Sequence, residues 1–84
     1  MITIRYWAAA KEAAGVAEEQ VRGGTLADVL AEVTARHSDS PTFERVLRIC
    51  ALLVDGTPSG SRDPATVPVN DGATVEVLPP YAGG

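Results

Sequence analysis

The C-terminal residues hold the groups in this sequence that are best suited to chemistry. The printed chain ends in two glycines, Gly83 and Gly84. A free α-carboxylate at Gly84 would be ionised at neutral pH, because its ordinary pKa is about 3.5, and it could attack the phosphorus of ATP. The resulting acyl adenylate has a good leaving group, so a persulfide or thiol sulfur could then attack the acyl carbon and leave a thiocarboxylate. We therefore predict that Gly84 is the reacting group and that Gly83, which has no side chain, lets it enter a narrow site.

Two prolines precede this end and would control how it is presented. Pro79 and Pro80 lack amide hydrogens and have a restricted φ, so we expect them to end a strand and direct the chain away from the body. An extended chain from Pro80 to Gly84 spans at most roughly 17 Å, which is enough to enter a buried cleft on a partner. Glycines also occur at chain ends that are simply frayed, so the tail by itself leaves both interpretations open.

The other reactive side chains do not form a catalytic set. His37 follows the longest helical pattern, where a lone histidine most often complements the helix dipole. Cys50 begins an apolar run and is expected to be a small buried side chain rather than a nucleophile. A single cysteine excludes an internal disulfide, and a single histidine leaves no cluster of metal ligands. We expect neither a bound cofactor nor a metal.

Length and charge restrict the classes of protein and partner. At 84 residues, 45% of them hydrophobic, the chain is expected to form one domain over residues 1–84 with a projecting tail from about residue 79. Its formal net charge of -4 disfavours nucleic acid and anionic membranes, which are bound through clusters of Lys and Arg, and makes a basic protein surface the better partner. The first residues lack the apolar segment of a signal peptide, so we expect a cytoplasmic protein.

The first part of the chain predicts two strands and a short helix. Apolar residues alternate with others over residues 2–6, which is typical of a strand with one buried face. The alanine-rich segment 8–14 should form a short helix that ends at Gly15. Residues 16–22 are polar enough to return as an edge strand.

A longer helix should follow, over residues 26–36. Thr25 and Asp28 have the spacing of a capping box, in which each side chain accepts a hydrogen bond from the other residue's amide. The apolar residues at helical spacing are Leu26, Val29, Leu30 and Val33. A second short helix could begin at Ser40-Pro41.

The rest of the chain predicts three strands and a loop. The apolar run 49–54 is expected to be a central strand closed by Asp55-Gly56. Residues 57–63 are rich in glycine, proline and serine and should form a loop. A brief edge strand over residues 66–69 and a last strand over residues 74–78 should follow. The order of these elements predicts an α+β fold in which a mixed sheet packs on one main helix.

Strand alternation also predicts an exposed apolar surface. Trp7 and Leu78 fall on the sheet face opposite the main helix, together with Arg5 and Glu76. Two large apolar side chains on that face suggest a surface for docking a partner. The alternatives are that a loop or the short helix covers them, or that the register is shifted by one residue.

A longer pattern unites these features. Over residues 71–84, an Asp-Gly turn, a last strand, a Pro-Pro pair and a terminal Gly-Gly follow one another. Further matching residues are Ile4, Tyr6, Trp7, Ala8, Lys11, Glu12, Gly15, Thr25, Leu26, Leu30, Leu53 and Val54. In these residues the whole chain resembles the MoaD/ThiS family of ubiquitin-like β-grasp proteins, and within it the small, sulfur-carrying subunit of molybdopterin synthase.

The resemblance implies a ubiquitin-like β-grasp fold, with about five strands in a mixed sheet packed on one main helix, and the function of a carrier. A ubiquitin-activating-like adenylyltransferase would use ATP to adenylate Gly84, and a persulfide donor would supply the sulfur of a thiocarboxylate. The tail would then enter the large subunit of molybdopterin synthase, within a heterotetramer, where its sulfur would help to build the dithiolene of molybdopterin. The resemblance places the catalytic side chains on that larger partner.

The resemblance also implies a docking surface. Carried over by position, this surface and the tail beyond it consist of Trp7, Pro58, Leu78, Pro79, Pro80, Tyr81 and Ala82. Tyr81 and Ala82 depart from the family's pattern, in which a smaller aliphatic residue and a serine are common at these positions.

Three other functions are compatible with the same sequence. The first is a carrier that delivers sulfur to thiazole, cysteine or tRNA instead. The second is a ubiquitin-like modifier that is joined to lysines through Gly84. The third is an interaction module whose tail has no chemical role.

Overall fold

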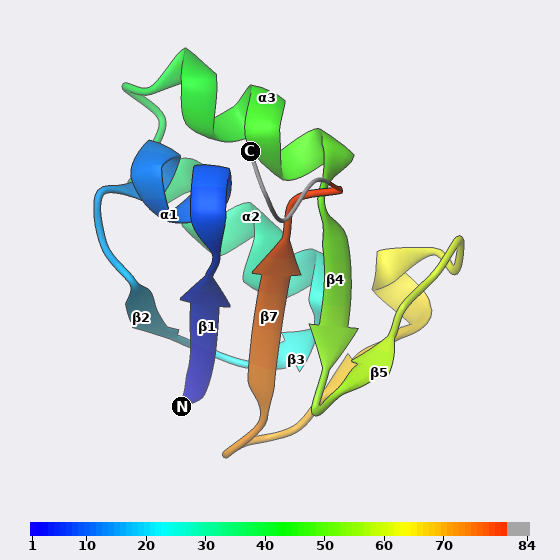
Figure 1. The fold of residues 1–84 in the computed structure, drawn as a ribbon. Coiled ribbons are helices and arrows are strands. Elements are labelled where there is room, and N and C mark those ends of the chain that lie inside the picture. The colour runs from blue at the N-terminus through cyan, green and yellow to red at the C-terminus, as the bar shows by residue number, and fades with distance from the viewer. Residues whose placement is uncertain (81–84) are drawn as a thin grey trace.

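A mixed β-sheet with helices packed on one face forms the body of the protein (Figure 1). The computed structural model describes residues 1–80. In this part of the chain, five strands form a sheet in the order β2-β1-β7-β4-β5. Their bounds are β1 (Ile2–Tyr6), β2 (Glu18–Val21), β4 (Ala51–Val54), β5 (Thr57–Pro58) and β7 (Thr74–Leu78). The predicted α+β class and the mixed sheet of about five strands are confirmed.

Helices and a second, two-stranded sheet complete the described part of the fold. The helices are α1 (Ala8–Ala14), α2 (Leu26–Arg36), α3 (Pro41–Ile49) and the 3₁₀ helix η1 (Pro64–Thr66). The small sheet pairs β3 (Gly24–Thr25) with β6 (Pro68–Val69). Helix α2 crosses behind the large sheet, and α1 and α3 lie towards one end of it (Figure 1). Within residues 1–80, no helix combines the length and the hydropathy needed to cross a membrane.

The two strands at the centre of the sheet come from opposite parts of the sequence. β1 and β7 run parallel, with Ile4 beside Val75 and Tyr6 beside Val77. β2 lies antiparallel on the other side of β1, and β4 lies antiparallel on the other side of β7. Because β1 and β7 point in the same direction, the residues that follow them, Trp7 and Pro79, lie at the same end of the sheet.

The core lies between the inner face of the sheet and one stripe of α2. Alternate residues of β1 and β7 point inward, and α2 presents apolar residues every three or four positions, as the two periodicities of the sequence predict. These side chains are all buried: Ile2, Ile4, Tyr6, Val75 and Val77 from the sheet, and Leu26, Val29 and Val33 from α2. Burial of this apolar surface is the main force that holds α2 against the sheet.

The predicted caps are present at both longer helices. At α2, the Thr25 side chain accepts a hydrogen bond from the Asp28 amide at 3.2 Å, and the Asp28 carboxylate accepts one from the Thr25 amide at 3.0 Å. At α3, the Ser40 hydroxyl accepts a hydrogen bond from the Phe43 amide at 3.3 Å, and Pro41 lies in the first turn. Satisfying these amides fixes where each helix begins.

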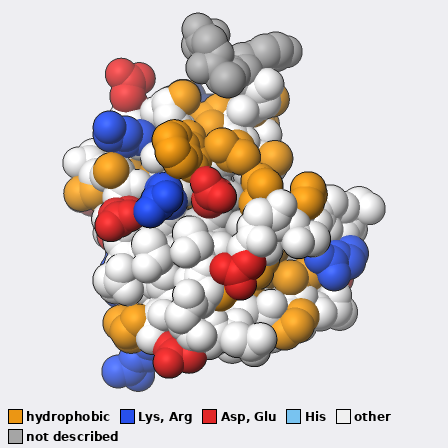
Figure 2. Space-filling model, turned by 60° about the horizontal axis from the view of Figure 1, so that its bottom comes forward, with side chains coloured by type: hydrophobic (Ala, Val, Ile, Leu, Met, Phe, Trp, Pro, Cys, Tyr) orange, Lys and Arg blue, Asp and Glu red, His pale blue; other side chains and the backbone are white. Residues whose placement is uncertain are grey.

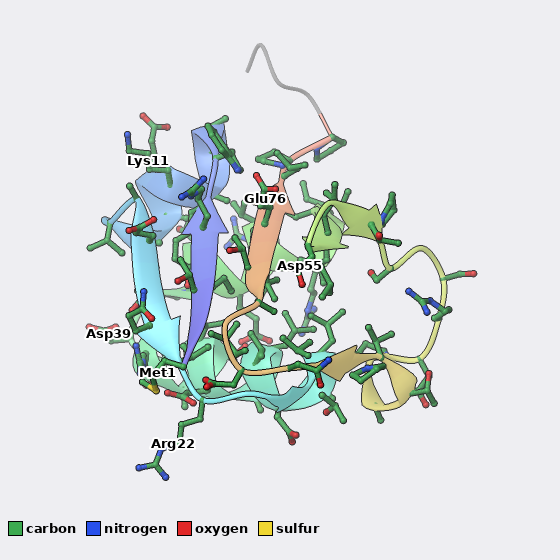
Figure 3. All side chains as sticks on the ribbon, turned by 90° about the horizontal axis from the view of Figure 1, so that it is seen from below. Met1, Lys11, Arg22, Asp39, Asp55 and Glu76 are labelled. Atoms are coloured by element: carbon green, nitrogen blue, oxygen red, sulfur yellow. The ribbon has the colours of Figure 1, made fainter. Side chains whose placement is uncertain are left out.

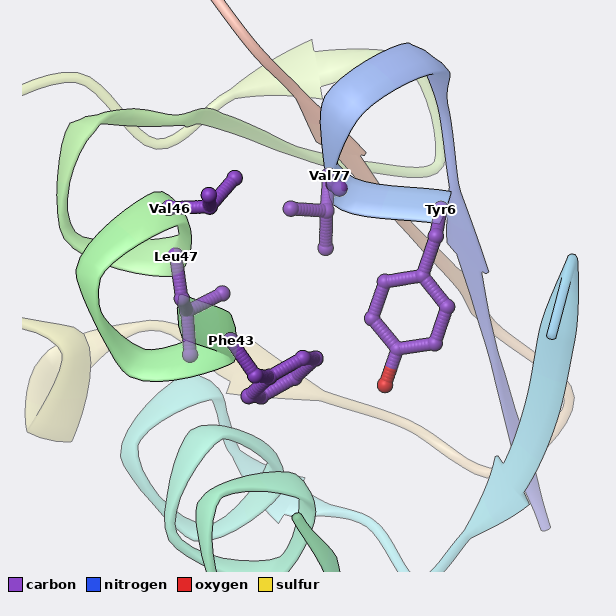
Figure 4. A pocket seen from close by; sticks show the side chains of 6 residues that line it. Tyr6, Phe43, Val46, Leu47 and Val77 are labelled. Atoms are coloured by element: carbon purple, nitrogen blue, oxygen red, sulfur yellow. The ribbon is translucent and has the colours of Figure 1, made fainter. Parts of the chain in front are cut away.

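Helix α3 covers the end of the core that lies nearest Trp7. Phe43 is buried and meets Tyr6 edge-on, with ring centroids 5.7 Å apart. Val46 and Leu47 of α3 face Val77 across a gap too narrow to hold a water molecule (Figure 4). The second short helix, which the sequence predicted to begin at Ser40-Pro41, is therefore part of the packed core.

Two boundaries differ from the sequence-based prediction. The predicted strand 49–54 begins only at Ala51, because α3 continues through Ile49 and leaves that side chain 63% exposed. The edge strand predicted over 16–22 is shorter and spans Glu18–Val21. Apolarity alone cannot separate the last turn of a helix from the start of a strand.

The predicted loop 57–63 is also only partly correct. Asp55 and Gly56 have φ of 50° and 83°, the positive values of a two-residue hairpin turn, and Thr57–Pro58 returns beside β4 as β5. The edge strand predicted over 66–69 is reduced to Pro68–Val69, because residues 64–66 form η1 instead. The hairpin brings Pro58 onto the sheet, which matters for the surface described next.

Candidate functional site

The outer face of the sheet carries an apolar patch at the end where β7 stops. Neighbouring strands align Leu78 with Ala51, and Leu53 with Pro58. Trp7 follows β1 directly, and its amide donates to the Val77 carbonyl at 3.2 Å, so it continues the pairing at the same end. We define the outer patch as Trp7, Ala51, Leu53, Pro58 and Leu78. The predicted outward placement of Trp7 and Leu78 is confirmed.

Trp7 is held on this face by a reversal of the backbone. Trp7 itself is extended, with φ of -120° and ψ of 147°, and is the N-cap of α1. The next residue, Ala8, has φ of 48°, in the left-handed region that residues with a side chain seldom adopt. The chain therefore turns sharply into α1 while the Trp7 side chain stays outside, 43% exposed. Neither a loop nor the short helix covers it within the described residues.

Charged side chains adjoin the outer patch. Cross-strand pairing places Glu18, Arg5, Glu76 and Leu53 in one row across the outer face. The Arg5 Nε lies 3.4 Å from a Glu18 carboxylate oxygen. The Trp7 indole Nε1 donates to Glu76 Oε2 at 3.0 Å. Figure 2 shows hydrophobic side chains gathered at this end of the molecule, with acidic and basic side chains next to them.

The root of the tail follows β7 on the edge of this patch. The last pair of the β4–β7 ladder is Ala51 with Leu78, so the ladder stops where Pro79 begins, as predicted. Pro79 is half-buried and Pro80 is exposed. The remaining predicted site residues, Tyr81, Ala82, Gly83 and Gly84, lie outside the described residues, and their roles stay predictions.

A polar cluster that the sequence did not reveal lies at the edge of the sheet. The Tyr6 hydroxyl donates to Glu19 Oε2 at 2.7 Å, and His37 Nε2 lies 2.6 Å from the same oxygen. The His37 ring stacks on Phe43, with centroids 4.2 Å apart. His37 is the C-cap of α2, as the dipole argument requires, but its contacts tie α2 to β2. Spacing could not show this, because Glu19 and His37 are distant in sequence.

The surroundings of this cluster shift the pKa of two of its side chains, Glu19 and Tyr6. Burial raises the pKa of Glu19, but hydrogen bonds with His37 and Tyr6 and the charges of His37 and Arg36 outweigh it, so the net pKa is lowered. Burial, together with the Glu19 carboxylate, raises the pKa of Tyr6. Glu19 therefore accepts hydrogen bonds as a carboxylate, and Tyr6 donates as a phenol. This arrangement stabilises the fold and faces the inner side of the sheet, away from the outer patch.

Cys50 lacks the setting of a reactive thiol. It is half-buried at the end of α3, its Sγ donates to the Val46 carbonyl at 3.1 Å, and burial raises its pKa. A raised pKa lowers the fraction of thiolate, which is the nucleophilic form. Among residues 1–80, no group of three His, Cys, Asp or Glu side chains is placed to hold a metal ion.

Comparison with known proteins identifies relatives of the whole chain. The model of the ThiS family matches residues 4–84. A sulfur carrier subunit of molybdopterin synthase from Chlamydomonas reinhardtii is 29% identical over an alignment 86 residues long, which covers 99% of this chain and 98% of that protein. The family match extends through the C-terminal residues that the structure does not describe.

Solved structures show the same fold. The small archaeal modifier protein 1 of Methanosarcina acetivorans matches with a TM-score of 0.80 and 22% identity, over 99% of this chain and 95% of that one. A chain from the complex of subunits 1 and 2 of the Helicobacter pylori molybdopterin-converting factor matches with a TM-score of 0.69 and 20% identity, over 99% and 97%. At these identities the likeness establishes the fold, which is the ubiquitin-like β-grasp expected from the sequence.

Proposed function

This chain belongs to the ThiS family of sulfur carriers, and we propose that it carries sulfur as a thiocarboxylate on Gly84 and serves as the small subunit of a molybdopterin synthase. The observation that supports this proposal most directly is the nearly full-length similarity to the Chlamydomonas reinhardtii sulfur carrier subunit. The family match adds to it, because it runs to Gly84. The fold supports it as well, because the parallel β1–β7 pair puts the start of the tail beside the outer patch.

The proposed chemistry takes place on the carboxylate of Gly84 and uses side chains of partner proteins. The carboxylate attacks the α-phosphorus of ATP, forming an acyl adenylate and releasing pyrophosphate. A persulfide sulfur then attacks the acyl carbon and displaces AMP, leaving an acyl disulfide. A second thiol then attacks the sulfur of the acyl disulfide that belongs to the persulfide donor. The thiocarboxylate is the leaving group, and the second thiol and the donor sulfur are left joined as a disulfide. No bound cofactor is needed on this chain, because ATP is consumed on the adenylyltransferase.

The outer patch supplies the surface for docking in this proposal. Exposed apolar side chains that lie together are typical of protein interfaces, and aromatic residues are enriched there. Trp7, Pro58 and Leu78 would contact the large synthase subunit, while Pro79 to Gly84 reaches its active site. The Helicobacter pylori relative is described as one subunit of a two-subunit complex, which supports a partner of this kind.

Loading of Gly84 is the direct test. The chain is incubated with a ubiquitin-activating-like adenylyltransferase, ATP and a persulfide donor, and its intact mass is measured. The proposal expects the mass increase that corresponds to replacing one oxygen by one sulfur, located at Gly84 by fragmentation. A chain that lacks Gly84 serves as the control and should not load. Absence of the exchange in the full chain would rule out the carrier function.

Delivery distinguishes the molybdopterin pathway from the other sulfur-transfer pathways. The loaded chain is mixed with the large molybdopterin synthase subunit and the pterin precursor, and the dithiolene product is assayed. Product formation supports the proposed pathway. Loading without product formation would leave a sulfur carrier that serves thiazole, cysteine or tRNA.

A protein-modifier function is the second candidate, because the archaeal modifier protein gives a TM-score of 0.80. In that case Gly84 would form isopeptide bonds with lysine side chains of other proteins. Conjugates of higher mass in a cell lysate, lost when Gly84 is deleted, would support it. Their absence, together with product formation in the synthase assay, would exclude it.

A further inference from the structure

We propose that Glu76 makes the outer patch selective for a partner that places an arginine or lysine side chain opposite it. This inference rests on the proposed function, because it concerns the surface through which the carrier would dock. Glu76 is the residue of interest because its carboxylate lies among the apolar side chains of that surface. The argument depends on the register of the sheet, on the bonds that Glu76 makes and on the cost of removing water from a charge.

The register places Glu76 among the apolar side chains of the outer patch. It pairs with Leu53 on β4 and with Arg5 on β1, and paired residues point to the same face. Leu78 is two residues further along the same strand and therefore lies on that face as well. Glu76 is half-buried, and its Oε2 accepts the Trp7 indole N–H at 3.0 Å. Any protein that covers Trp7, Leu53 and Leu78 must also cover this carboxylate.

Glu76 has no ion-pair partner among the residues that the structure describes. The ion pairs found within residues 1–80 do not include it, and Arg5, its neighbour on β1, pairs with Glu18 instead. The indole N–H is a neutral donor that occupies one of the two carboxylate oxygens. In the free protein, water is left to solvate the rest of the carboxylate. Figure 3 shows Glu76 on the strand that leads towards the tail.

Docking would remove that water. A purely apolar partner would leave a buried charge with a single neutral hydrogen bond, which is unfavourable. An arginine or lysine side chain replaces the lost water with a charge-assisted hydrogen bond, and a guanidinium can contact the carboxylate through two donors. Glu76 therefore favours basic partners and disfavours apolar ones. Specificity comes from the free-energy cost of burying the charge against an apolar partner as well as from attraction to a basic one. This matches the preference for a basic protein surface that the net charge of -4 already indicates.

The substitution Glu76→Gln removes the charge of this side chain while keeping its shape. Glutamine has almost the same size, and its side-chain oxygen can still accept the Trp7 N–H, so the patch keeps its form while it loses the charge. Affinity for the large molybdopterin synthase subunit from the same genome is measured by calorimetry or surface plasmon resonance at low and high salt. We expect the variant to bind at least about 10-fold more weakly at low salt, with a faster dissociation rate and a smaller dependence on salt.

Asp39→Asn is the matched control. Asp39 is exposed, and Figure 3 shows it on a different side of the molecule from Glu76. The substitution changes the net charge by the same amount, so it reports any general electrostatic attraction. We expect it to leave the dissociation rate unchanged. Thermal unfolding of both variants verifies that each is folded.

Three results would overturn the inference. The first is equal or tighter binding by Glu76→Gln, in which case docking does not use the charge. The second is an equal loss of affinity in Asp39→Asn, which would mean that overall charge alone is responsible. The third is failure of the unaltered chain to bind the large subunit, which would also overturn the proposed partner. The first two leave the proposed function intact if Gly84 still loads and the synthase still forms product.

Discussion

Glu19 is a residue on which several parts of the fold converge. Its Oε2 meets the Tyr6 hydroxyl and His37 Nε2, and its Oε1 lies 3.6 Å from Arg36. These partners come from β1 and from the C-terminal end of α2, so one carboxylate joins the edge strand β2 to two other elements. At 15% exposure it is shielded enough for these bonds to affect stability.

Glu19→Gln should make stability less dependent on pH in the acid range. Because the folded-state pKa of Glu19 is lowered from 4.5, its carboxylate adds stability that is complete above pH 4.5 and is lost as the pH falls through the folded-state pKa. The variant lacks this contribution and should be less stable by about 1–3 kcal/mol at pH 7. Urea unfolding at stepped pH should show the two proteins converging towards low pH. Parallel curves would mean that the Glu19 carboxylate does not contribute.

Trp7 and Leu78 should dominate binding at the outer patch. Truncation of a central aromatic residue at an interface often costs 2 kcal/mol or more, so Trp7→Ala should weaken binding to the large synthase subunit by about 30-fold. Leu78→Ala should have a smaller effect in the same direction. Gln20→Ala is the control, since Gln20 lies on the outer face but beside Thr3, away from the patch. Unchanged affinity in both patch variants would show that docking uses another surface.

At the scale of single residues, alternation predicted which side chains point outward but not which contact one another. The outward placement of Trp7 and Leu78 follows from a period of two along each strand. The contacts between Trp7 and Glu76, and between His37 and Glu19, depend on how separate elements are aligned in space. No spacing within one segment contains that information, so His37 was predicted only as a helix-end residue.

Among the elements, the sharp turns at Ala8 and at Asp55-Gly56 have the greatest influence on the outer patch. The first keeps Trp7 on the outer face, and the second returns the chain so that Pro58 joins β4. Both use positive φ, although Ala8 and Asp55 carry side chains. Such a conformation is held by its surroundings at some cost in free energy.

Gly56→Ala should destabilise the fold, whereas Ala8→Gly should not. A Cβ on Gly56 would meet no atom within 4 Å, so the cost of alanine there is the backbone strain at φ of 83°, about 1–2 kcal/mol. Ala8→Gly relieves similar strain but adds freedom to the unfolded chain, so it should be neutral or slightly stabilising. Chemical denaturation measures both. Destabilisation by Ala8→Gly as large as that by Gly56→Ala would contradict this account.

The helices and strands with clear sequence signals were predicted well, and those defined by tertiary contacts were not. The capping box at Thr25 and the stripe of α2 are local features, and both are confirmed. The end of α3 at Ile49 and the short strand β5 are not local, because each depends on what packs or pairs beside it. Asp55-Gly56 was predicted to close the strand before it. The residues after it were predicted as a loop because they include Pro58, although Thr57–Pro58 forms β5.

In the molecule as a whole, the buried core of the described residues and the proposed reacting group lie in separate parts of the sequence. The buried core extends from Ile2 to Val77, whereas the proposed chemistry takes place at Gly84. The sequence analysis predicted a mixed sheet but neither the order of its strands nor the parallel β1–β7 pair, because alternation gives no direction to a strand. The identity of the partner likewise depends on surfaces that belong to another protein.

Deletion of Gly83 and Gly84 should therefore separate stability from function. The shortened chain should unfold with a free energy within about 0.5 kcal/mol of the full chain, because it keeps every buried residue found within residues 1–80. It should fail to load with sulfur. Denaturant titration measures the stability of the shortened chain, and its intact mass shows whether it has been loaded with sulfur. A large loss of stability would show that the end residues belong to the folded body.

The parallel pairing of β1 and β7 also determines how the protein withstands force. A force applied to Pro79 along the axis of β7 would load that strand lengthwise. That strand is hydrogen-bonded to β1 on one side and to β4 on the other, so the load shears both ladders lengthwise and their bonds share it. A pull across the strand would instead open the bonds one after another. A force on Pro79 along the axis of β7 would therefore have to break the bonds of both ladders together before the strand could slide out of the sheet.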